Sequence, residues 1–367
     1  MDFVNQTKLA AGWTMGFRKD GRELMVVAAK GTFMIPSRSD QEPVLATAQV
    51  PLVTGDTFTG EPGFSAVEYE VDYAHLKPAC DVLVNGCAYA PGGRPASCVP
   101  VALVAGPIRK HFEVIGERRY ELGILGSSAP PPKPFVSLPI SYDKAYGGAD
   151  HHPREPDKVR TYADNPVGVG YYPLTQGHDR SGKPLACTRE PGKPADDPNQ
   201  SYRPMAFGPM GRNFKDRYKF AGTYDKNWQD HRAPFFPADF DYRYFQAAPE
   251  DQQMPYPQGG ETILLENLSP RGRLVFALPR RSVPVLFIPY RGQAYEQQAV
   301  IDTVVIEPEF DRFTMTWRTS APMGRSCFDL MRVVVGRGMR EHVRDSRRGG
   351  KRHFKNLAEF IRWKRTR

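Results

Sequence analysis

Short runs of apolar residues, separated by glycine and proline, dominate the first third of the chain. Several runs alternate apolar and polar positions, the period of a half-exposed β-strand. Asn85 and Gly86 divide one run into two apolar halves, which predicts a tight hairpin. The predicted strands lie within 24–35, 67–73, 81–90, 98–105 and 109–115. Such a series indicates an antiparallel, sandwich-like β domain. On the strand 109–115 we expect Lys110 and His111 to face solvent.

A second set of apolar runs follows a proline-rich stretch. Three consecutive prolines at 130–132 favour an extended spacer rather than a helix or strand. Beyond residue 260, further strands are expected at 261–268, 274–278, 283–288, 303–306 and 312–318. We therefore predict a mainly β protein with few short helices. It divides into an antiparallel β domain (1–125), a Pro-rich linker (126–134), a loop-rich β domain (135–335) and a basic tail (336–367).

The stretch 222–253 differs from the rest of the chain in its aromatic content. Eight of its 32 residues are Phe, Tyr or Trp, and three prolines interrupt it, so it cannot form one long helix. It is interpreted either as a loop that covers the core or as a surface that binds a partner. Together with a Tyr pair further upstream, the candidate partner-binding residues are Tyr171, Tyr172, Trp228, Phe235, Phe236, Tyr242 and Tyr244.

The formal charge of +9 is located almost entirely in the tail. Residues 336–367 hold 12 Lys and Arg against three acidic residues, whereas the remaining 335 residues carry 38 basic and 38 acidic side chains. Nucleic-acid binding is therefore not expected of the body, and only the tail could contact phosphates. In the tail, Phe354, Leu357, Phe360 and Ile361 recur at helical spacing, which predicts a short amphipathic helix.

Leader, membrane and cysteine patterns favour a cytoplasmic protein. Residues 1–20 contain no apolar run preceded by basic residues, so no signal peptide is expected. No stretch approaches the 18 or more apolar residues of a membrane span. The five cysteines (Cys80, Cys87, Cys98, Cys187 and Cys327) lack the spacing of a zinc site.

Motifs for catalysis are missing from the sequence. It holds no GxSxG, Walker A or HExxH motif, and the neighbouring His151 and His152 would point to opposite faces of a strand. Two acidic pairs beside aromatic residues, Asp239 with Asp241 and Glu250 with Asp251, are the one arrangement that suggests a glycosidase. We expect no enzyme activity, cofactor or metal, with a carbohydrate-binding or carbohydrate-cleaving protein as the alternative.

Ordered motifs run through residues 1–320. They include the KGTF segment at 30–33, the KPACDVLVNGCAYAPGG segment at 77–93 and NPVGVGYY at 165–172. They continue with FGPMGRNF at 207–214, GTYDKNW at 222–228, RAPFFPADFDYRYFQAAPEDQQ at 232–253 and GGETILLENLSP at 259–270. Together these motifs resemble a family encoded beside the VgrG spike and PAAR-like tip proteins of bacterial type VI secretion systems. The basic stretch after about residue 336 has no counterpart in this pattern.

The resemblance implies a cytoplasmic adaptor or co-chaperone without catalytic residues. Such a protein would bind a secreted effector or a PAAR-like tip and help to load it onto VgrG. The aromatic residues named above would then be contacts to that partner, and the basic tail would be a docking segment for a specific partner.

Overall fold

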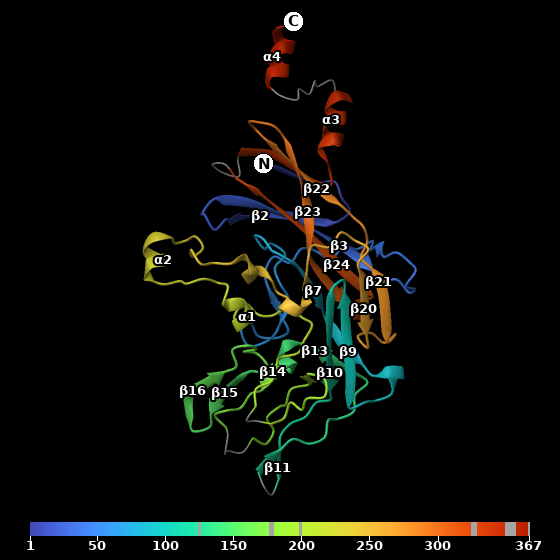
Figure 1. Cartoon of the computed structure of the whole chain (residues 1–367), viewed down its shortest axis with the longest axis vertical. Helices are drawn as coiled ribbons and strands as arrows, with labels where there is room; N and C mark the ends of the chain where they lie inside the picture. Colours follow the sequence, from blue (N-terminus) through green and yellow to red (C-terminus); the bar gives the residue numbers. More distant parts are fainter. Residues whose placement is uncertain (124–125, 176–179, 198–199, 324–328, 349–356, 366–367) are drawn as a thin grey trace.

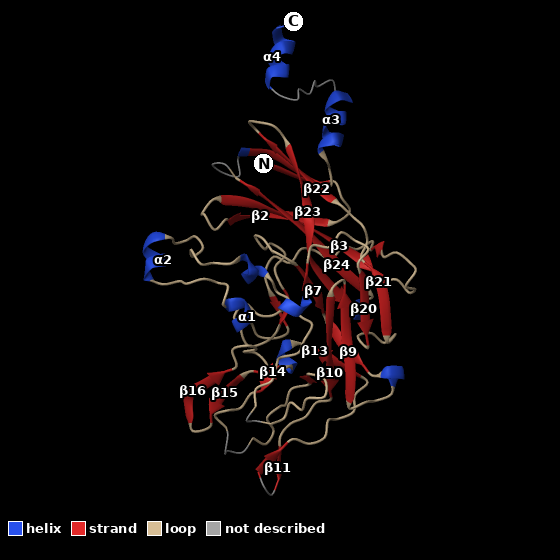
Figure 2. Cartoon of the chain, viewed as in Figure 1, coloured by secondary structure: helices blue, strands red, loops and turns tan. Residues whose placement is uncertain are grey.

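Two large β-sheets form the body of the protein, and loops and short helices surround them (Figures 1 and 2). The structure is a computed structural model that describes residues 1–123, 126–175, 180–197, 200–323, 329–348 and 357–365. Cys327 and Phe354 lie outside these residues. The mainly β fold expected from the sequence is confirmed.

The larger sheet is mixed, because two of its strand pairs are parallel. β1 pairs in parallel with β25, and β7 pairs in parallel with β23. Its main path runs β1 (Asp2–Asn5), β25 (Leu330–Val335), β22 (Val283–Pro289), β23 (Tyr295–Glu307), β24 (Arg312–Pro322), β3 (Glu23–Met34) and β2 (Ala10–Phe17). Three further strands join it: β4 (Val44–Leu45), β7 (Cys80–Val84) and β19 (Gln253–Met254).

The second sheet has five antiparallel strands built around two local hairpins. Its order is β18 (Thr188–Arg189), β10 (Ile108–Ile115), β9 (Cys98–Ala105), β20 (Thr262–Glu266) and β21 (Arg273–Ala277). Small two-stranded pairs complete the β structure: β5 (Thr57–Phe58) with β6 (Val67–Tyr69), β8 (Gly86–Tyr89) with β13 (Ser137–Ile140), β11 (Glu121–Gly123) with β12 (Gly126–Ser128), β14 (Tyr146–Gly147) with β17 (Val169–Gly170), and β15 (Ala149–His152) with β16 (Glu155–Thr161).

Strands from before and after the predicted linker 126–134 share both sheets. β3 pairs with β24 over eleven residues, β7 pairs with β23, and β9 pairs with β20. The predicted linker itself contains β12, and Phe135 next to it bridges to Ala96. The sheets therefore join the residues on either side of the proline run instead of separating them.

The hairpin predicted at Asn85-Gly86 is wrong. β7 ends just before Asn85 and β8 begins at Gly86, but β7 pairs with β19 and β23, whereas β8 pairs with β13. The tight turn expected here needs left-handed backbone at both central residues, and Asn85 is not among the residues with positive φ. Its backbone N–H instead donates to the carbonyl of Ile306, 3.0 Å away. A long-range pairing has replaced the local one.

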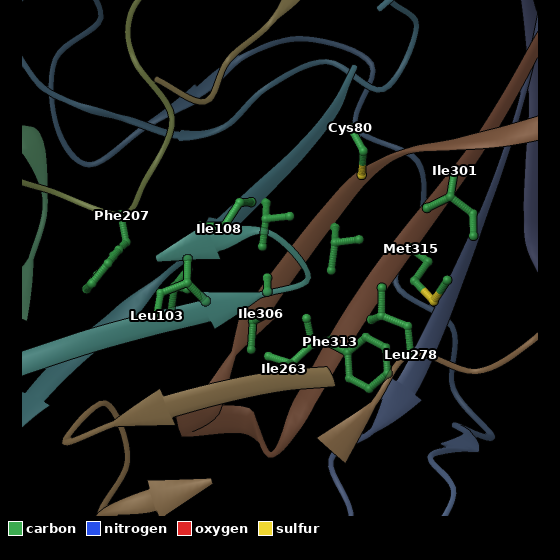
Figure 3. Close-up of a cluster of buried hydrophobic side chains, with 14 of the residues drawn as sticks. Cys80, Leu103, Ile108, Phe207, Ile263, Leu278, Ile301, Ile306, Phe313 and Met315 are labelled. Carbon is green, nitrogen blue, oxygen red and sulfur yellow. The ribbon is translucent and has the colours of Figure 1, made fainter. Parts of the chain in front are cut away.

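The apolar core lies between the two large sheets (Figure 3). Alternate residues of β3, among them Met25, Val27 and Phe33, point into it because successive side chains of a strand face opposite sides. The facing sheet contributes inward residues of β9, β10, β20 and β21. The residues labelled in Figure 3 are Cys80, Leu103, Ile108, Phe207, Ile263, Leu278, Ile301, Ile306, Phe313 and Met315.

The opposite face of the larger sheet is polar, yet it is buried as well. Lys30 on β3 and Arg318 on β24 lie on this face and are at most 5% exposed. A β-bulge between Ile301 and Thr303 adds to it. Ile301 and Val304 both enter the apolar core, so Asp302 and Thr303 are left together on the polar side.

In the part of the chain that the structure describes, four short α-helices lie at the periphery of the body. α1 (Lys215–Tyr218) and α2 (Lys226–His231) belong to the central part of the chain, and α2 stands to the side of the sheets (Figure 1). α3 (Met339–Arg348) and α4 (Leu357–Arg365) form the basic tail beyond one end of the body, and α4 spans three of the four positions predicted as helical. Among the described residues, no helix has the length and apolar character needed to cross a membrane.

Candidate functional site

Residues 222–245, named the aromatic arm here, leave the body beside the sheets and return to it (Figure 1). Asp225 caps α2 by accepting a hydrogen bond from the backbone N–H of Trp228 at 2.8 Å. The indole N–H of Trp228 donates to the carbonyl of Phe235, 2.7 Å away. Near the start of the arm, Thr223 donates hydrogen bonds to the carboxylate of Asp239, which lies where the chain returns to the body. Local polar contacts therefore hold this loop closed.

The outer part of the arm packs against the turn between β2 and β3. The rings of Phe17 and Phe235 meet edge to face with their centroids 5.3 Å apart. Arg232 donates to the carbonyl of Lys19 at 2.9 Å, and the backbone N–H of Lys19 donates to the hydroxyl of Tyr242 at 3.0 Å. Contacts on both sides of the turn fix the direction of the arm.

An aromatic stack forms the inner part of the arm. Phe236 lies parallel to the buried Phe240 at 4.1 Å, and Phe245 meets both rings nearly at right angles. The ring of His75 lies against Phe236 and Phe245 at 5.5 and 5.1 Å. Burial lowers the pKa of His75, so the imidazole stays neutral beside these rings at neutral pH.

Arg217 on α1 connects the arm to buried carboxylates of the body. Its guanidinium pairs with Glu70 and donates to the carbonyls of Met210 at 2.7 Å and Tyr244 at 3.1 Å. The Tyr244 ring lies 5.8 Å from the same guanidinium. Lys77 approaches the other oxygen of Glu70 at 3.5 Å. One arginine thus joins the arm, α1 and the segment that carries Glu70.

Asp81 on β7 holds the two residues that directly follow the arm. Its carboxylate accepts from the side-chain amide of Gln246 at 2.7 Å and from the backbone N–H of Ala247 at 2.8 Å. It also pairs with Lys77 at 2.7 Å, and Lys77 donates to Thr303 at 3.2 Å. The arm therefore ends on the polar face of the larger sheet.

These contacts belong to a buried charge network of eight side chains. Four are cationic and four are anionic, so the network is neutral: Lys30, Lys77, Arg217 and Arg318 with Glu70, Asp72, Asp81 and Asp302. Burial alone would raise the pKa of Glu70, but the charges of Arg217, Lys77 and Arg212 outweigh it and lower that pKa. Glu70 is accordingly ionised at neutral pH.

The structure distributes the seven predicted contact residues over two places. Trp228, Phe235, Phe236, Tyr242 and Tyr244 all belong to the aromatic arm, and each is half-buried. Tyr171 instead contacts the rings of Tyr146 and Tyr162, and the buried Tyr172 donates its hydroxyl to the carbonyl of Pro184 at 2.8 Å. The Tyr172 ring contacts Tyr120, so neither tyrosine makes its ring contacts with the arm.

Three of the four carboxylates that suggested a glycosidase have hydrogen-bond or ion-pair partners. Asp239 accepts hydrogen bonds from Thr223, and Asp241 pairs with Arg243 at 2.6 Å. Hydrogen bonds from these partners lower the pKa of both carboxyl groups, whereas a general acid needs a raised pKa. Asp251 pairs with Lys110 and Arg203, which lie far from it in sequence. Asp239 and Asp241 thus stabilise the arm itself, and Asp251 connects distant parts of the chain.

Exposed tyrosines and a cleft mark the solvent side of the arm. Tyr218 is 63% exposed and Tyr224 is 53% exposed, and Tyr224 packs against Trp228 at 4.7 Å. A cleft of about 340 Å³ lies at the foot of the arm, and Phe220 and Arg243 stack 4.1 Å apart in its wall. Tyrosine, tryptophan and arginine are the residues enriched at protein interfaces.

The charge network was missed in the sequence, although a signal for part of it is present. Asp81 and Asp302 are single acidic residues inside otherwise apolar runs, CDVLV and AVIDTVVI. A charge in such a run must find a buried partner, because an unpaired buried charge is very costly. Lys110 was predicted to face solvent, but it is 5% exposed and donates to Gln252 at 2.7 Å. Only His111 of that pair is exposed.

Comparison with known protein families gives one assignment. Residues 20–318 match a family of uncharacterized proteins conserved in bacteria, DUF2169. The chain belongs to this family. No curated protein and no solved structure matches the chain significantly.

The DUF2169 match includes the aromatic arm and the charge network but not the outermost strand pair of the larger sheet. β1 and β25 both lie outside the matched residues, as does the basic tail. The arm and its buried support therefore belong to the region that this protein shares with its family. In the described part of the chain, no three His, Cys, Asp or Glu side chains gather as a metal site.

Proposed function

We propose that this DUF2169 protein is an adaptor that binds another protein through the aromatic arm. More specifically, we propose a type VI secretion co-chaperone that acts in the cytoplasm and helps to load an effector or a PAAR-like tip onto VgrG. The observation that carries the adaptor proposal is the combination of exposed rings with a rigid support. The type VI assignment rests on the motif resemblance described above.

The rigid support favours binding because little side-chain freedom is left to lose. Half-buried Trp228 is fixed by its indole hydrogen bond, and Tyr224 packs on it with more than half of its surface free. Ordering a mobile side chain at an interface costs about 0.5–1.5 kcal/mol, so pre-ordered aromatic residues bind at a lower cost. The adjacent cleft of about 340 Å³ has room for an anchoring side chain of a partner.

The test is a pulldown from the native host with the tag at the N-terminus, under conditions that express the secretion genes. We expect recovery of a PAAR-like protein, a VgrG protein or an effector. Tyr224→Ala should weaken binding of the purified partner about tenfold or more, as for an interface hot spot. Tyr290→Ala is the matched control, because Tyr290 is 64% exposed in the turn after β22 and should change affinity less than twofold.

Two outcomes would contradict the proposal at different levels. Equal affinity of Tyr224→Ala and the unaltered protein for a verified partner would show that the arm is not the contact. Recovery of partners unrelated to secretion would leave an adaptor but remove the type VI assignment. A chain ending at Gly338 lacks both tail helices and tests whether the tail contributes to the same contact.

A further inference from the structure

A second cleft, of about 410 Å³, lies in the loop-rich part of the body and is remote in sequence from the aromatic arm. Its walls come from the segment after β10, from the proline run and from the residues before β18. Apolar walls are supplied by Pro130, Pro131, Val169, Pro184 and Leu185. Its charged lining is Glu117, Arg118, Arg119, Glu121, Lys133, Asp143 and Lys144.

Arg118 is the unusual residue of this cleft. Its side chain is 4% exposed, and its Nη1 donates to the Asp196 carboxylate at 3.0 Å. Its Nε and Nη2 atoms are buried and have no hydrogen-bond partner in the described structure. Buried donors of a charged group are costly when they are left unpaired. Nε and Nη2 lie on the same edge of the guanidinium, the edge that binds a carboxylate with two parallel hydrogen bonds.

A second arginine repeats the pattern close by. Arg180 is 7% exposed, and its buried Nε and Nη2 atoms have no hydrogen-bond partner among the described residues. Its guanidinium lies 6.0 Å from the centre of the Tyr120 ring, and the Tyr120 hydroxyl donates to the Asp196 carbonyl at 3.3 Å. Tyr120 thus contacts both Arg180 and Asp196, and the Asp196 carboxylate occupies only one nitrogen of Arg118.

The carboxylates that line the cleft have other partners or lie at its edge. Glu117 pairs with Lys144 at 2.9 Å, and the Lys144 hydrogen bond lowers the pKa of Glu117. Asp143 accepts from Thr59 at 2.8 Å and also from Ser141. Glu121 is exposed. The lining carries four cations against three carboxylates, and Asp196, which pairs with Arg118, supplies a fourth carboxylate beside it.

We propose that this cleft binds an organic carboxylate, with the carboxylate on the free edge of Arg118. The proline and leucine walls suit the carbon skeleton of such a ligand better than they suit a small inorganic anion. A free dicarboxylic acid and an acidic side chain of a peptide offer the same chemistry. The inference stands on Arg118 and the cleft alone, and it is independent of the proposed role of the aromatic arm.

The test is calorimetric titration of the full chain with succinate, tetraglutamate and inorganic phosphate, with the ionic strength held constant by sodium chloride. We expect saturable binding of succinate or tetraglutamate, and the tighter of the two identifies the source. Arg118→Met should weaken that binding at least tenfold. Arg118→Lys keeps the positive charge but cannot make two parallel hydrogen bonds to a carboxylate, so this variant should also bind the carboxylate more weakly. Arg38→Met is the matched control, since Arg38 is exposed and pairs with Asp40.

The stability of the variants gives a second readout. Without carboxylate, Arg118→Met should unfold at the same urea concentration as the unaltered protein or at a higher one, because unpaired buried donors are removed. Carboxylate should raise the midpoint of the unaltered protein only. If Arg118→Met does not fold, the urea midpoint of the unaltered protein is compared with and without carboxylate. A midpoint that carboxylate does not raise would then overturn the proposal. Absence of saturable carboxylate binding, equal binding by Arg118→Met, or tighter binding of phosphate than of both carboxylates would overturn the proposal.

Discussion

Replacing Arg217 with methionine tests whether charge, rather than shape alone, holds the aromatic arm. The change leaves the Glu70 carboxylate buried and removes hydrogen bonds to the carbonyls of Met210 and Tyr244. Removing one member of a buried ion pair costs about 3–5 kcal/mol. Lys77 and Arg212 remain within 3.5 Å of Glu70, so we expect the low end, about 3 kcal/mol.

The assay is urea unfolding at pH 7 for a double-mutant cycle. Arg217→Met and Glu70→Gln are measured singly and together, and we expect the double variant to lose at least about 1 kcal/mol less than the sum of the two. Arg243→Met is the matched control, because this exposed arginine of the arm pairs only at the surface and should leave the midpoint nearly unchanged. Additive single effects would refute a direct coupling of Arg217 to Glu70.

The pH dependence separates charge from packing. In the unaltered protein the folded-state pKa of Glu70 is lowered from 4.5, so its contribution to stability is present above pH 4.5. That contribution is lost as the pH falls through the lowered pKa. In Arg217→Met the cation that lowers the pKa of Glu70 most is gone, so that pKa is expected to be higher than in the unaltered protein. The stability difference between the two proteins should therefore shrink as the pH falls from the folded-state pKa of the variant to that of the unaltered protein. A difference that does not change with pH would show that Arg217 acts by packing.

Two further predictions concern Lys110 and Gly222. Burial lowers the pKa of Lys110 to about 8 from 10.5, so the unfolded chain binds more protons than the folded protein between these pH values. Folding stability should therefore rise with pH over this range, by about 3 kcal/mol at most relative to Lys110→Met. Equal urea midpoint profiles of the two proteins from pH 7 to 10.5 would contradict this. Gly222→Ala should lower the free energy of unfolding by about 2 kcal/mol or more, because φ is +81° and the new Cβ would lie 2.9 Å from Pro237. In the control Gly63→Ala, at φ +86°, the new Cβ meets nothing within 4 Å, and the loss should be about 1 kcal/mol. Both values are read from urea midpoints.

Strand positions were predicted correctly from the sequence where the paired strands are close to each other in the chain. The strands predicted at 98–105, 109–115, 261–268 and 274–278 are present as β9, β10, β20 and β21, which form the hairpins β9–β10 and β20–β21. Long-range pairing was not accessible in the same way. Asn85-Gly86 has the composition of a hairpin turn, yet β23 and β19 outcompete the local partner. Nothing in the local pattern of β7 indicates strands more than 150 residues away.

The polar face of the larger sheet explains why the site could be predicted only in part. Thr314, Thr316 and Arg318 alternate with apolar residues, and such alternation normally marks a solvent face. Here all three are buried beneath loops from distant parts of the chain. The aromatic density of the arm was visible in the sequence, whereas its support by Arg217 and Asp81 depends on which loops cover that face.

The pairing of β1 with β25 has a consequence for synthesis of the chain. Asp2 and Arg332 lie opposite each other and form an ion pair at 2.8 Å, although 330 positions separate them. At a translation rate of about 5–20 residues per second, β1 leaves the ribosome roughly 20–60 s before its partner exists. The central strand β3 waits almost as long for β24. Nascent chains of this protein therefore carry β1 and one edge of β3 without their partner strands until translation is nearly complete.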